Sequence, residues 1–220
     1  TRGGKVSFTH LIGWAVVEAL AEMPAMNASY VTDDAGRPTL REPAHVAFGL
    51  AIDVPASSGE RRLLVPSIKK ADLMDVAGFI AAYEGLVAKA RDGSLEVDDF
   101  RGTTVTLTNP GMIGTLHSVP RLMPGQGLIV GVGSMAYPAA FAGTSEETLA
   151  RQGIGKIVTL TSTYDHRVIQ GAASGEFLRL IERKLLRLDG FWERTFESLR
   201  IPHEPVTWAR DTTYDAELET

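Results

Sequence analysis

His166 has the clearest chemical context of any residue in this sequence. It stands in the segment Tyr164-Asp165-His166-Arg167, which follows an apolar stretch and precedes a glycine and a helical pattern. Functional side chains often lie where a strand ends in a loop, and an imidazole can take up a proton near neutral pH. His166 is therefore a candidate general base. The same residues also fit a structural role, in which His166 packs in a loop and pairs with Asp165.

The other histidines are His10, His45, His117 and His203. No two histidines have the spacing that would place them on one helical face as metal ligands, so the sequence predicts no zinc site. We expect His10 on the polar side of a helix, His45 at the start of a strand and His203 among prolines near the C-terminus. The chain has no cysteine, which excludes disulfides, thiolate metal sites and cysteine nucleophiles.

The glycine-rich stretches do not match nucleotide-binding motifs. Gly125, Gly127, Gly131 and Gly133 do not fit the G-x-G-x-x-G pattern, and the segment 153–156 is not a P-loop. No G-x-S-x-G elbow is present, so a Ser-His-Asp mechanism is also weakly supported. Glycines spaced along an apolar strand are typical of bends and of close backbone approach.

Composition narrows the class of protein. The chain has 220 residues, 44% hydrophobic and 22% charged, which is ordinary for a globular domain. Its formal net charge of −5 disfavours binding to nucleic acid. No run approaches the roughly 18 apolar residues of a membrane span, and the start lacks a signal peptide's apolar core. We expect a soluble, cytoplasmic protein without nucleic-acid or membrane partners, and the opening Thr1 indicates an excerpt of a longer chain.

The elements that would position His166 follow from apolar periodicity. Four helices are expected. The first covers 8–23, and the second is capped by Asp72 and ended by Gly93. The third begins near Gly171 and points Phe177, Ile181, Leu185 and Leu188 inward, and the fourth covers 191–199. Expected strands are a hairpin at 28–31 and 37–40, a pair at 45–54 and 62–68, and the segments 104–107, 128–132 and 157–161. This mixture favours an α+β or layered α/β sandwich over a doubly wound sheet.

Two segments resemble the signatures of one family. The run TSTYDHRVIQG, residues 161–171, resembles S-x-D-H-R-x-x-[D/N]-G of the catalytic domain of dihydrolipoamide acyltransferases from 2-oxo acid dehydrogenase complexes. The run TVTLTNPGMIG, residues 104–114, resembles the second signature, in which a serine or threonine precedes Asn-x-Gly. KVSFTHLIGWAVVEAL and ARDGSLEVDDFRG also resemble family segments in the same order, so the likeness covers most of the chain.

The family resemblance implies a fold and an assembly. We expect an α/β, chloramphenicol acetyltransferase-like two-layer sandwich of mixed sheet and helices, assembled as a homotrimer with active sites between subunits. The acyltransferase domain would cover residues 1–200. Residues 201–220 would be a C-terminal extension or a linker towards a missing dehydrogenase region.

A narrower likeness concerns the acyl group and the partners. TLHSVPRLMPGQG and IPHEPVTWARD resemble the actinobacterial form, in which this domain is fused ahead of a thiamine-diphosphate 2-oxoglutarate dehydrogenase. The resemblance implies succinyl transfer between a dihydrolipoyl-lysine thioester and coenzyme A. A separate lipoyl-bearing acyltransferase protein would supply lipoamide in trans, with dihydrolipoamide dehydrogenase as a further partner. Thiamine diphosphate and Mg would belong only to the missing region.

The same resemblance implies roles for Thr108, His166 and Gln170. As general base, His166 would take the proton of the attacking thiol; a free thiol titrates near about 8.5 and a free imidazole near about 6.5. The Thr108 hydroxyl would donate a hydrogen bond to the tetrahedral oxyanion, and no acyl-enzyme would form. Gln170 stands where the family usually has aspartate or asparagine, so we expect it to position groups without supplying charge.

Some alternatives stay open at this point. Without the matched motif, Thr108 would be interpreted only as a β-branched residue that favours a strand. Asp165 and Arg167 match the motif but are interpreted as structural residues. Nothing in the sequence determines the size of the acyl pocket, so a protein with the same fold could transfer acetyl or branched acyl groups. Gln170 and the absence of a lipoyl module also allow a non-catalytic trimeric scaffold for the dehydrogenase.

Overall fold

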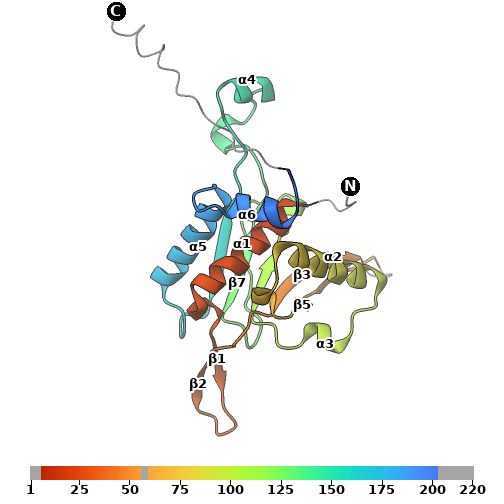
Figure 1. Ribbon diagram of the computed structural model, residues 1–220, viewed down its shortest axis with the longest axis vertical. Coiled ribbons are helices and arrows are strands. Elements are labelled where there is room, and N and C mark those ends of the chain that lie inside the picture. Colours follow the sequence, from red (N-terminus) through yellow and green to blue (C-terminus); the bar gives the residue numbers. More distant parts are fainter. Residues whose placement is uncertain (1–5, 56–58, 203–220) are drawn as a thin grey trace, which may run out of the picture.

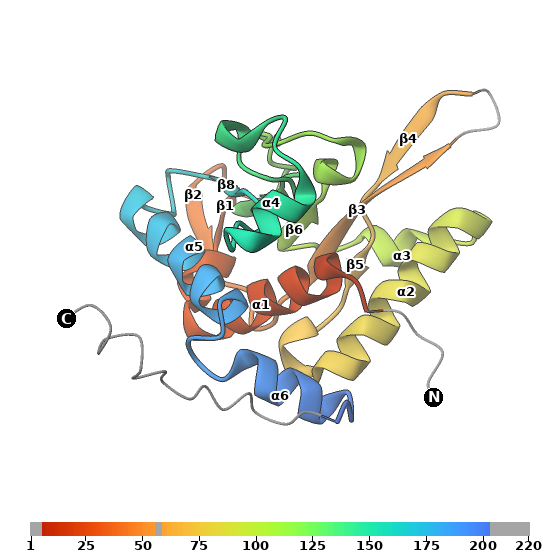
Figure 2. The same ribbon diagram turned by 90° about the horizontal axis from the view of Figure 1, so that it is seen from above.

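The computed structural model describes residues 6–55 and 59–202. His203 and nearly all of the predicted extension 201–220 lie outside the described residues. Helices and strands separate into two layers, with the long helices gathered on one face of a mixed sheet (Figures 1 and 2). The layered α/β sandwich predicted from the sequence is therefore confirmed.

The helical layer contains the helices that the apolar periodicity predicted. These are α1 (Phe8–Glu22), α2 (Val76–Asp92), α5 (Gly171–Leu185) and α6 (Phe191–Ser198). Two short helices were not predicted, α3 (Val97–Phe100) and α4 (Glu146–Arg151). Helix α4 stands away from the two layers, on a long excursion of the chain between two strands (Figure 1).

The main sheet has six strands in the order β4-β3-β6-β7-β8, with β5 also paired to β3. Their bounds are β3 (Phe48–Pro55), β4 (Arg61–Leu64), β5 (Ser67–Ile68), β6 (Val105–Thr108), β7 (Leu128–Val132) and β8 (Leu160–Tyr164). Strands β3, β6 and β7 are parallel, while β4, β5 and β8 run antiparallel to their neighbours. A separate hairpin pairs β1 (Ser29–Thr32) with β2 (Pro38–Arg41).

Alternation along the central strands decides which face meets the helices. Phe48, Leu50, Val105, Leu107 and Leu128 are buried in the core between sheet and helices. Their neighbours in sequence point to the opposite face, because successive strand residues alternate. That second face is rich in glycine and threonine.

The loop that precedes β7 covers this second face closely. Thr161 Oγ1 donates to the Ser118 carbonyl at 2.9 Å. A Cβ on Gly131 would lie 2.6 Å from Thr161 Oγ1, and one on Gly133 would lie 1.8 Å from the Leu116 carbonyl oxygen. The predicted close backbone approach is thus confirmed at Gly133, where a larger residue would push the loop off the sheet, whereas a side chain at residue 131 would first meet the Thr161 hydroxyl.

Several boundaries differ from the sequence predictions. The strand expected at 45–54 begins only at Phe48, so His45 lies before it, and the strand expected at 62–68 is divided into β4 and β5. Asp75, not Asp72, caps α2, and Asp72 instead accepts the backbone N–H of Val46 at 2.7 Å. Strand β8 begins at Leu160, since Ile157 only forms an isolated bridge to Ala136. Leu188, predicted to face inward, follows the end of α5 and is 63% exposed.

The predicted place of His10 on the polar side of a helix is wrong. The side chain is buried, its Nδ1 accepts the Ser7 N–H at 3.2 Å, and its Nε2 lies 2.8 Å from Glu84. Burial lowers the pKa of His10 and the contact with Glu84 opposes that shift. His10 therefore caps α1 and ties it to α2.

Candidate active site

His166 lies in a tight turn immediately after β8. The Asp165 N–H donates to the Gly127 carbonyl at 2.9 Å, and the Asp165 carbonyl accepts the N–H groups of Val168 and Ile169. These bonds fix the backbone on both sides of His166. The imidazole is exposed, with its ring centroid 5.5 Å from that of Tyr164.

The His166 turn borders a cavity of about 790 Å³. Two arginines reach this cavity. Arg167 is neutralised by Asp165, whereas Arg121 makes no ion pair or hydrogen bond with any residue in the described part of the chain. The cavity therefore carries an uncompensated positive charge close to His166, which favours an anionic ligand. Its lining comprises Tyr30, residues 121–126 and residues 164–167.

Gln170 lies near His166 in the same connection between β8 and α5. It is the N-cap residue of α5, but its exposed side chain makes no capping bond. The next residue is a glycine, and a Cβ there would lie 3.3 Å from Tyr164 Oη and 4.0 Å from His166 Nε2. Gly171 thus keeps the surroundings of the imidazole open.

Thr108 ends β6 and is half-buried. The following residue, Asn109, donates from Nδ2 to Thr9 Oγ1 at 2.8 Å, which ties the turn to the start of α1. A Cβ on Gly111 would lie 2.2 Å from the Gly133 backbone. The Asn-x-Gly sequence after Thr108 is therefore required for the turn to lie against the chain leaving β7.

Strand register places Thr108 and His166 at opposite ends of the sheet. Thr108 pairs with Gly131, and Gly131 pairs with Thr161. Tyr164 lies three residues further along β8, which is about 10 Å at the usual rise per strand residue, and His166 follows two residues later. Within one chain the structure brings His166 near Gln170 but does not bring Thr108 to either.

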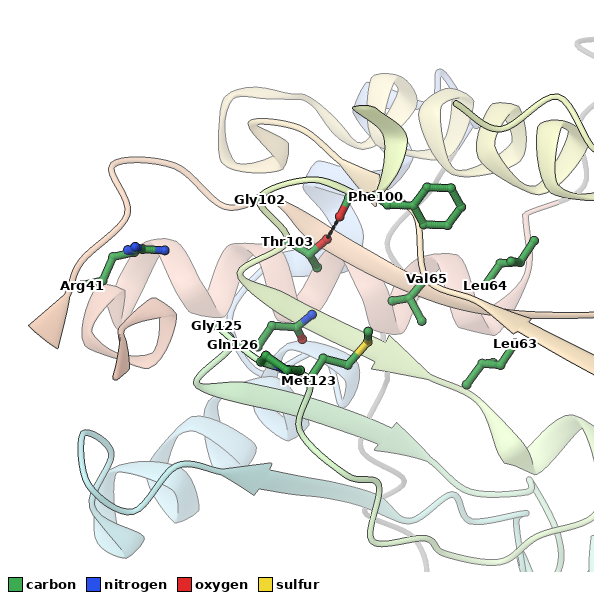
Figure 3. A pocket seen from close by; sticks show the side chains of 11 residues that line it. Arg41, Leu63, Leu64, Val65, Phe100, Gly102, Thr103, Met123, Gly125 and Gln126 are labelled. Atoms are coloured by element: carbon green, nitrogen blue, oxygen red, sulfur yellow. Dashed lines mark hydrogen bonds between the residues drawn. The ribbon is translucent and has the colours of Figure 1, made fainter. Parts of the chain in front are cut away.

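A second cavity, of about 400 Å³, contains none of the three predicted residues. It lies between the end of the β4 segment and the chain near Gln126, and Figure 3 shows Phe100, Thr103 and Met123 around it. The segment 123–126 lines both cavities. The two cavities therefore lie on either side of the segment 123–126.

The sequence did not single out Tyr30 or Arg121 as site residues. Tyr30 comes from the separate hairpin and Arg121 from the loop over the sheet, and both come to line the His166 cavity only through tertiary folding. Arg121 did stand within the TLHSVPRLMPGQG segment, but no spacing rule connects it to the histidine.

Residues 6–55 and 59–202, the part of the chain that the structure describes, contain neither a metal-ligand cluster nor a membrane helix. That part of the chain contains no group of three or more His, Asp or Glu side chains placed to hold a metal ion. None of its helices is long and apolar enough to cross a membrane.

The fold and the histidine turn define a class of protein. Residues 1–190 match the family model of the 2-oxoacid dehydrogenases acyltransferase (catalytic domain), and the chain belongs to this family. The predicted resemblance is thereby confirmed.

The curated relatives are larger proteins. The chain is 57% identical over 211 residues to the 2-oxoglutarate dehydrogenase E1/E2 component of Corynebacterium glutamicum, covering 96% of this chain and 17% of that protein. It is 58% identical to the multifunctional 2-oxoglutarate metabolism enzyme of Mycobacterium sp. (strain JLS), again over 96% of this chain but 16% of that protein. The chain thus spans about a sixth of the relatives' length.

Solved structures agree on the fold. A probable dihydrolipoamide acetyltransferase from Listeria monocytogenes superposes with a TM-score of 0.71 at 26% identity, covering 86% of this chain and 74% of that one. Azotobacter vinelandii dihydrolipoamide acetyltransferase gives a TM-score of 0.70 at 27% identity, with 86% and 72% covered. That structure is described as addressing the roles of a serine, a histidine and an asparagine in the catalytic mechanism.

Proposed function

We propose that this domain transfers a succinyl group between a dihydrolipoyl-lysine thioester and coenzyme A. It acts as a homotrimer in which His166 of one subunit and Thr108 of its neighbour serve the same thioester. His166 is the general base, Thr108 stabilises the oxyanion, and Gln170 positions groups beside His166.

The observation that carries this proposal is the separation of Thr108 and His166 within one chain. Thr108 and His166 are separated by three residues of β8 and part of a turn. This distance is too large for both side chains to contact one thioester. In a cyclic assembly each subunit presents one surface and receives another, so the Thr108 end of one chain can meet the His166 end of the next. Exposed apolar side chains near Thr108 fit such a contact; Met112 is 83% and Ile113 is 73% exposed.

In the proposed reaction, the acyl group passes from one thiol to the other through a tetrahedral intermediate. The imidazole of His166 takes the proton from the coenzyme A thiol as the sulfur attacks the thioester carbonyl carbon. A tetrahedral oxyanion forms, and the Thr108 hydroxyl donates a hydrogen bond to it. The carbon–sulfur bond to the lipoyl group then breaks, and protonated His166 returns its proton to the leaving thiolate.

Likeness to the Azotobacter enzyme supports the residue assignments. The serine, histidine and asparagine named for that enzyme are a hydroxyl, an imidazole and an amide, as are Thr108, His166 and Gln170. The histidine and the asparagine there are four residues apart, as His166 and Gln170 are here.

The succinyl assignment rests on the 2-oxoglutarate enzymes named among the relatives. Arg121, which has no ion-pair or hydrogen-bond partner among residues 6–55 and 59–202, lines the His166 cavity and agrees with substrates that carry carboxylate or phosphate groups. In this proposal lipoamide arrives on a separate lipoyl-bearing acyltransferase protein, and dihydrolipoamide dehydrogenase reoxidises the lipoyl group. Thiamine diphosphate and Mg serve a dehydrogenase region outside this chain.

We place the domain boundary at about residue 200, with 201–220 as an extension or linker. Helix α6 lies beyond residue 190, where the family match ends, yet Phe191 is buried in the core. The Ile201 N–H still donates to the Phe196 carbonyl. These contacts support a catalytic domain that includes α6.

Complementation between variants tests the shared site. His166→Ala and Thr108→Ala proteins are each expected to be strongly impaired. When they are unfolded and refolded together, every mixed trimer regains one wild-type site. When equal amounts assemble at random, about three trimers in four are mixed. Each mixed trimer has one intact site out of three, so the preparation should have about a quarter of wild-type activity. Refolding either variant alone restores nothing. No recovery in mixed trimers confirmed by mass would overturn the shared site.

An assay of acyl preference tests the substrate. The isolated domain receives coenzyme A with succinyl-, acetyl- or isobutyryl-dihydrolipoamide, and acyl-coenzyme A is measured. We expect the highest kcat/KM with succinyl. A preference for acetyl or isobutyryl would replace succinyl in the proposal, while no turnover with any donor would indicate the non-catalytic scaffold.

A further inference from the structure

Tyr30, from the β1–β2 hairpin, packs on the chain that carries His166. The Arg167 guanidinium carbon lies 3.6 Å from the centroid of the Tyr30 ring, a close cation–π contact. The hairpin is not part of the main sheet. A separate element therefore reaches the residue that follows His166 in sequence.

Arg167 is held on its other side by Asp165. Its Nε donates to Asp165 Oδ1 at 2.8 Å and its Nη2 donates to Oδ2 at 2.5 Å, a two-point contact. The same Oδ1 also accepts the Arg167 backbone N–H at 3.1 Å. His166 is thus flanked by two residues whose side chains are bound to each other.

Gly127 joins the hairpin and the turn through the backbone. Its carbonyl accepts the Asp165 N–H, and a Cβ at this glycine would lie 1.8 Å from the Ala28 carbonyl oxygen. The strand that enters the hairpin therefore lies directly against the chain that anchors the turn. The Tyr30 stack and the Gly127 contact fix the hairpin to the turn at two places.

The imidazole itself lacks such support. In the described part of the chain, His166 makes no side-chain hydrogen bond; its ring contact is with Tyr164. Its position is therefore set mainly by the backbone of the turn. Efficient proton transfer requires donor and acceptor within hydrogen-bond distance, and a displacement of about 1 Å can cost about 10²-fold in rate.

We infer that Tyr30 is a positioning residue for His166, acting through Arg167 and Asp165. Tyr30 holds the Arg167 guanidinium, Arg167 holds Asp165, and this pair fixes the backbone between them. The inference rests on the proposed general-base role of His166 and adds the hairpin to the catalytic apparatus as its support.

Matched substitutions test the inference in the trimeric protein. Tyr30→Leu removes the aromatic face and Tyr30→Phe keeps it. Arg167→Met removes the cation, and Arg37→Met serves as control, because Arg37 makes a comparable exposed ion pair with Asp33 at 2.8 Å on the same hairpin. For each variant we measure kcat, the KM for coenzyme A, the thermal midpoint and the trimer mass.

We expect Tyr30→Leu to lower kcat about tenfold, with the KM for coenzyme A and the thermal midpoint nearly unchanged. Tyr30→Phe and Arg37→Met should match the wild type. The Tyr30→Leu/Arg167→Met double variant should lose little more than Arg167→Met alone, because both substitutions break one chain of contacts.

Four results would overturn the inference. Equal losses in Tyr30→Leu and Tyr30→Phe would show that the aromatic face is not what matters. A kcat loss that follows a lowered thermal midpoint or a lost trimer would show a general structural role. A rise in the KM for coenzyme A alone would make these residues substrate ligands. His166→Ala is assayed in parallel. If His166→Ala stays active, the proposed function fails. If His166→Ala is inactive while Tyr30→Leu has wild-type activity, only this inference fails.

Discussion

His166 is exposed and its ring contact is with Tyr164, so its removal should affect chemistry with little effect on folding. We predict that His166→Ala lowers kcat by at least about 10², the usual contribution of a positioned general base. The free energy of unfolding should change by less than about 0.5 kcal/mol. Steady-state kinetics and urea denaturation on the same preparation measure both quantities. A variant with near wild-type turnover would remove His166 from the mechanism.

Gln170 should matter less than His166. Its side chain is exposed, makes no capping bond and carries no charge, so its loss removes orientation only. We predict a smaller fall in kcat for Gln170→Ala than for His166→Ala under identical conditions. Equal falls would show that the amide takes part directly in the reaction.

The Asp165–Arg167 pair should persist through the range in which a histidine base titrates. The hydrogen bonds from Arg167 lower the pKa of Asp165. Because the folded pKa lies below the unfolded value of about 3.9, the stabilisation is complete above pH about 4 and is lost as the pH falls through the folded pKa. We predict that the stability difference between wild type and Asp165→Asn is constant from pH 5 to 8 and shrinks below about 4, as thermal denaturation at each pH will show.

Among the elements, one buried lysine on α5 joins this helix to α1 and to the turn between α5 and α6. Lys184 Nζ lies 2.5 Å from Glu22, 3.2 Å from Asp189 and 3.4 Å from Glu18. Burial tends to lower the pKa of Lys184, but the hydrogen bonds and charges of these carboxylates outweigh burial and raise it. The ammonium therefore stays charged between α1, α5 and the turn that follows α5.

Removing this charge should destabilise the helical layer. We predict that Lys184→Met lowers the free energy of unfolding by about 3 kcal/mol, because the carboxylates around it lose their shared counter-charge. The raised pKa means that the contribution is present below pH about 10.4 and is lost as the pH rises through the folded value. Urea denaturation near pH 7.5 measures the loss. Arg179→Met, which breaks an exposed pair with Glu176, is the control and should be nearly neutral.

Element types were more predictable from the sequence than element ends. Residues 128–132 form a strand as predicted, because a buried parallel strand is a continuous apolar run. Strand β8 starts three residues later than predicted, since the apolar character of Ile157 does not reveal that it pairs with Ala136. Asp72 and Asp75 are both acceptable caps by type, and the choice between them depends on the tertiary contacts of Asp72 with the His45 side chain and the Val46 N–H.

At the scale of the whole molecule, the sequence motifs identified the family, but they could not show how the site residues are distributed. Thr108 and His166 both end strands, and local patterns do not report that β8 runs opposite to β7. The separation of the two residues depends on that direction. Tyr30 and Arg121 enter the His166 cavity through packing between distant segments, for which the sequence carries no local signal.

The assembly should therefore be visible in solution. We predict that the isolated domain has about three times the chain mass of 23.7 kDa by light scattering. If the proposed shared site is right, dilution that dissociates the trimer abolishes activity, because Thr108 and His166 lie at opposite ends of the sheet within one chain. A monomer with undiminished turnover would contradict this prediction.

The placement of Thr108 and His166 at opposite ends of the sheet also governs how a defective chain affects its partners. In the proposed trimer, a subunit that lacks one of these residues silences one site and leaves two working. A subunit that lacks both silences two sites, since it fails the neighbour on each side. With equal numbers of normal and defective copies and random assembly, about half of all sites would therefore stay intact for either single lesion and about a quarter for the combined one, although each single lesion alone inactivates a uniform trimer.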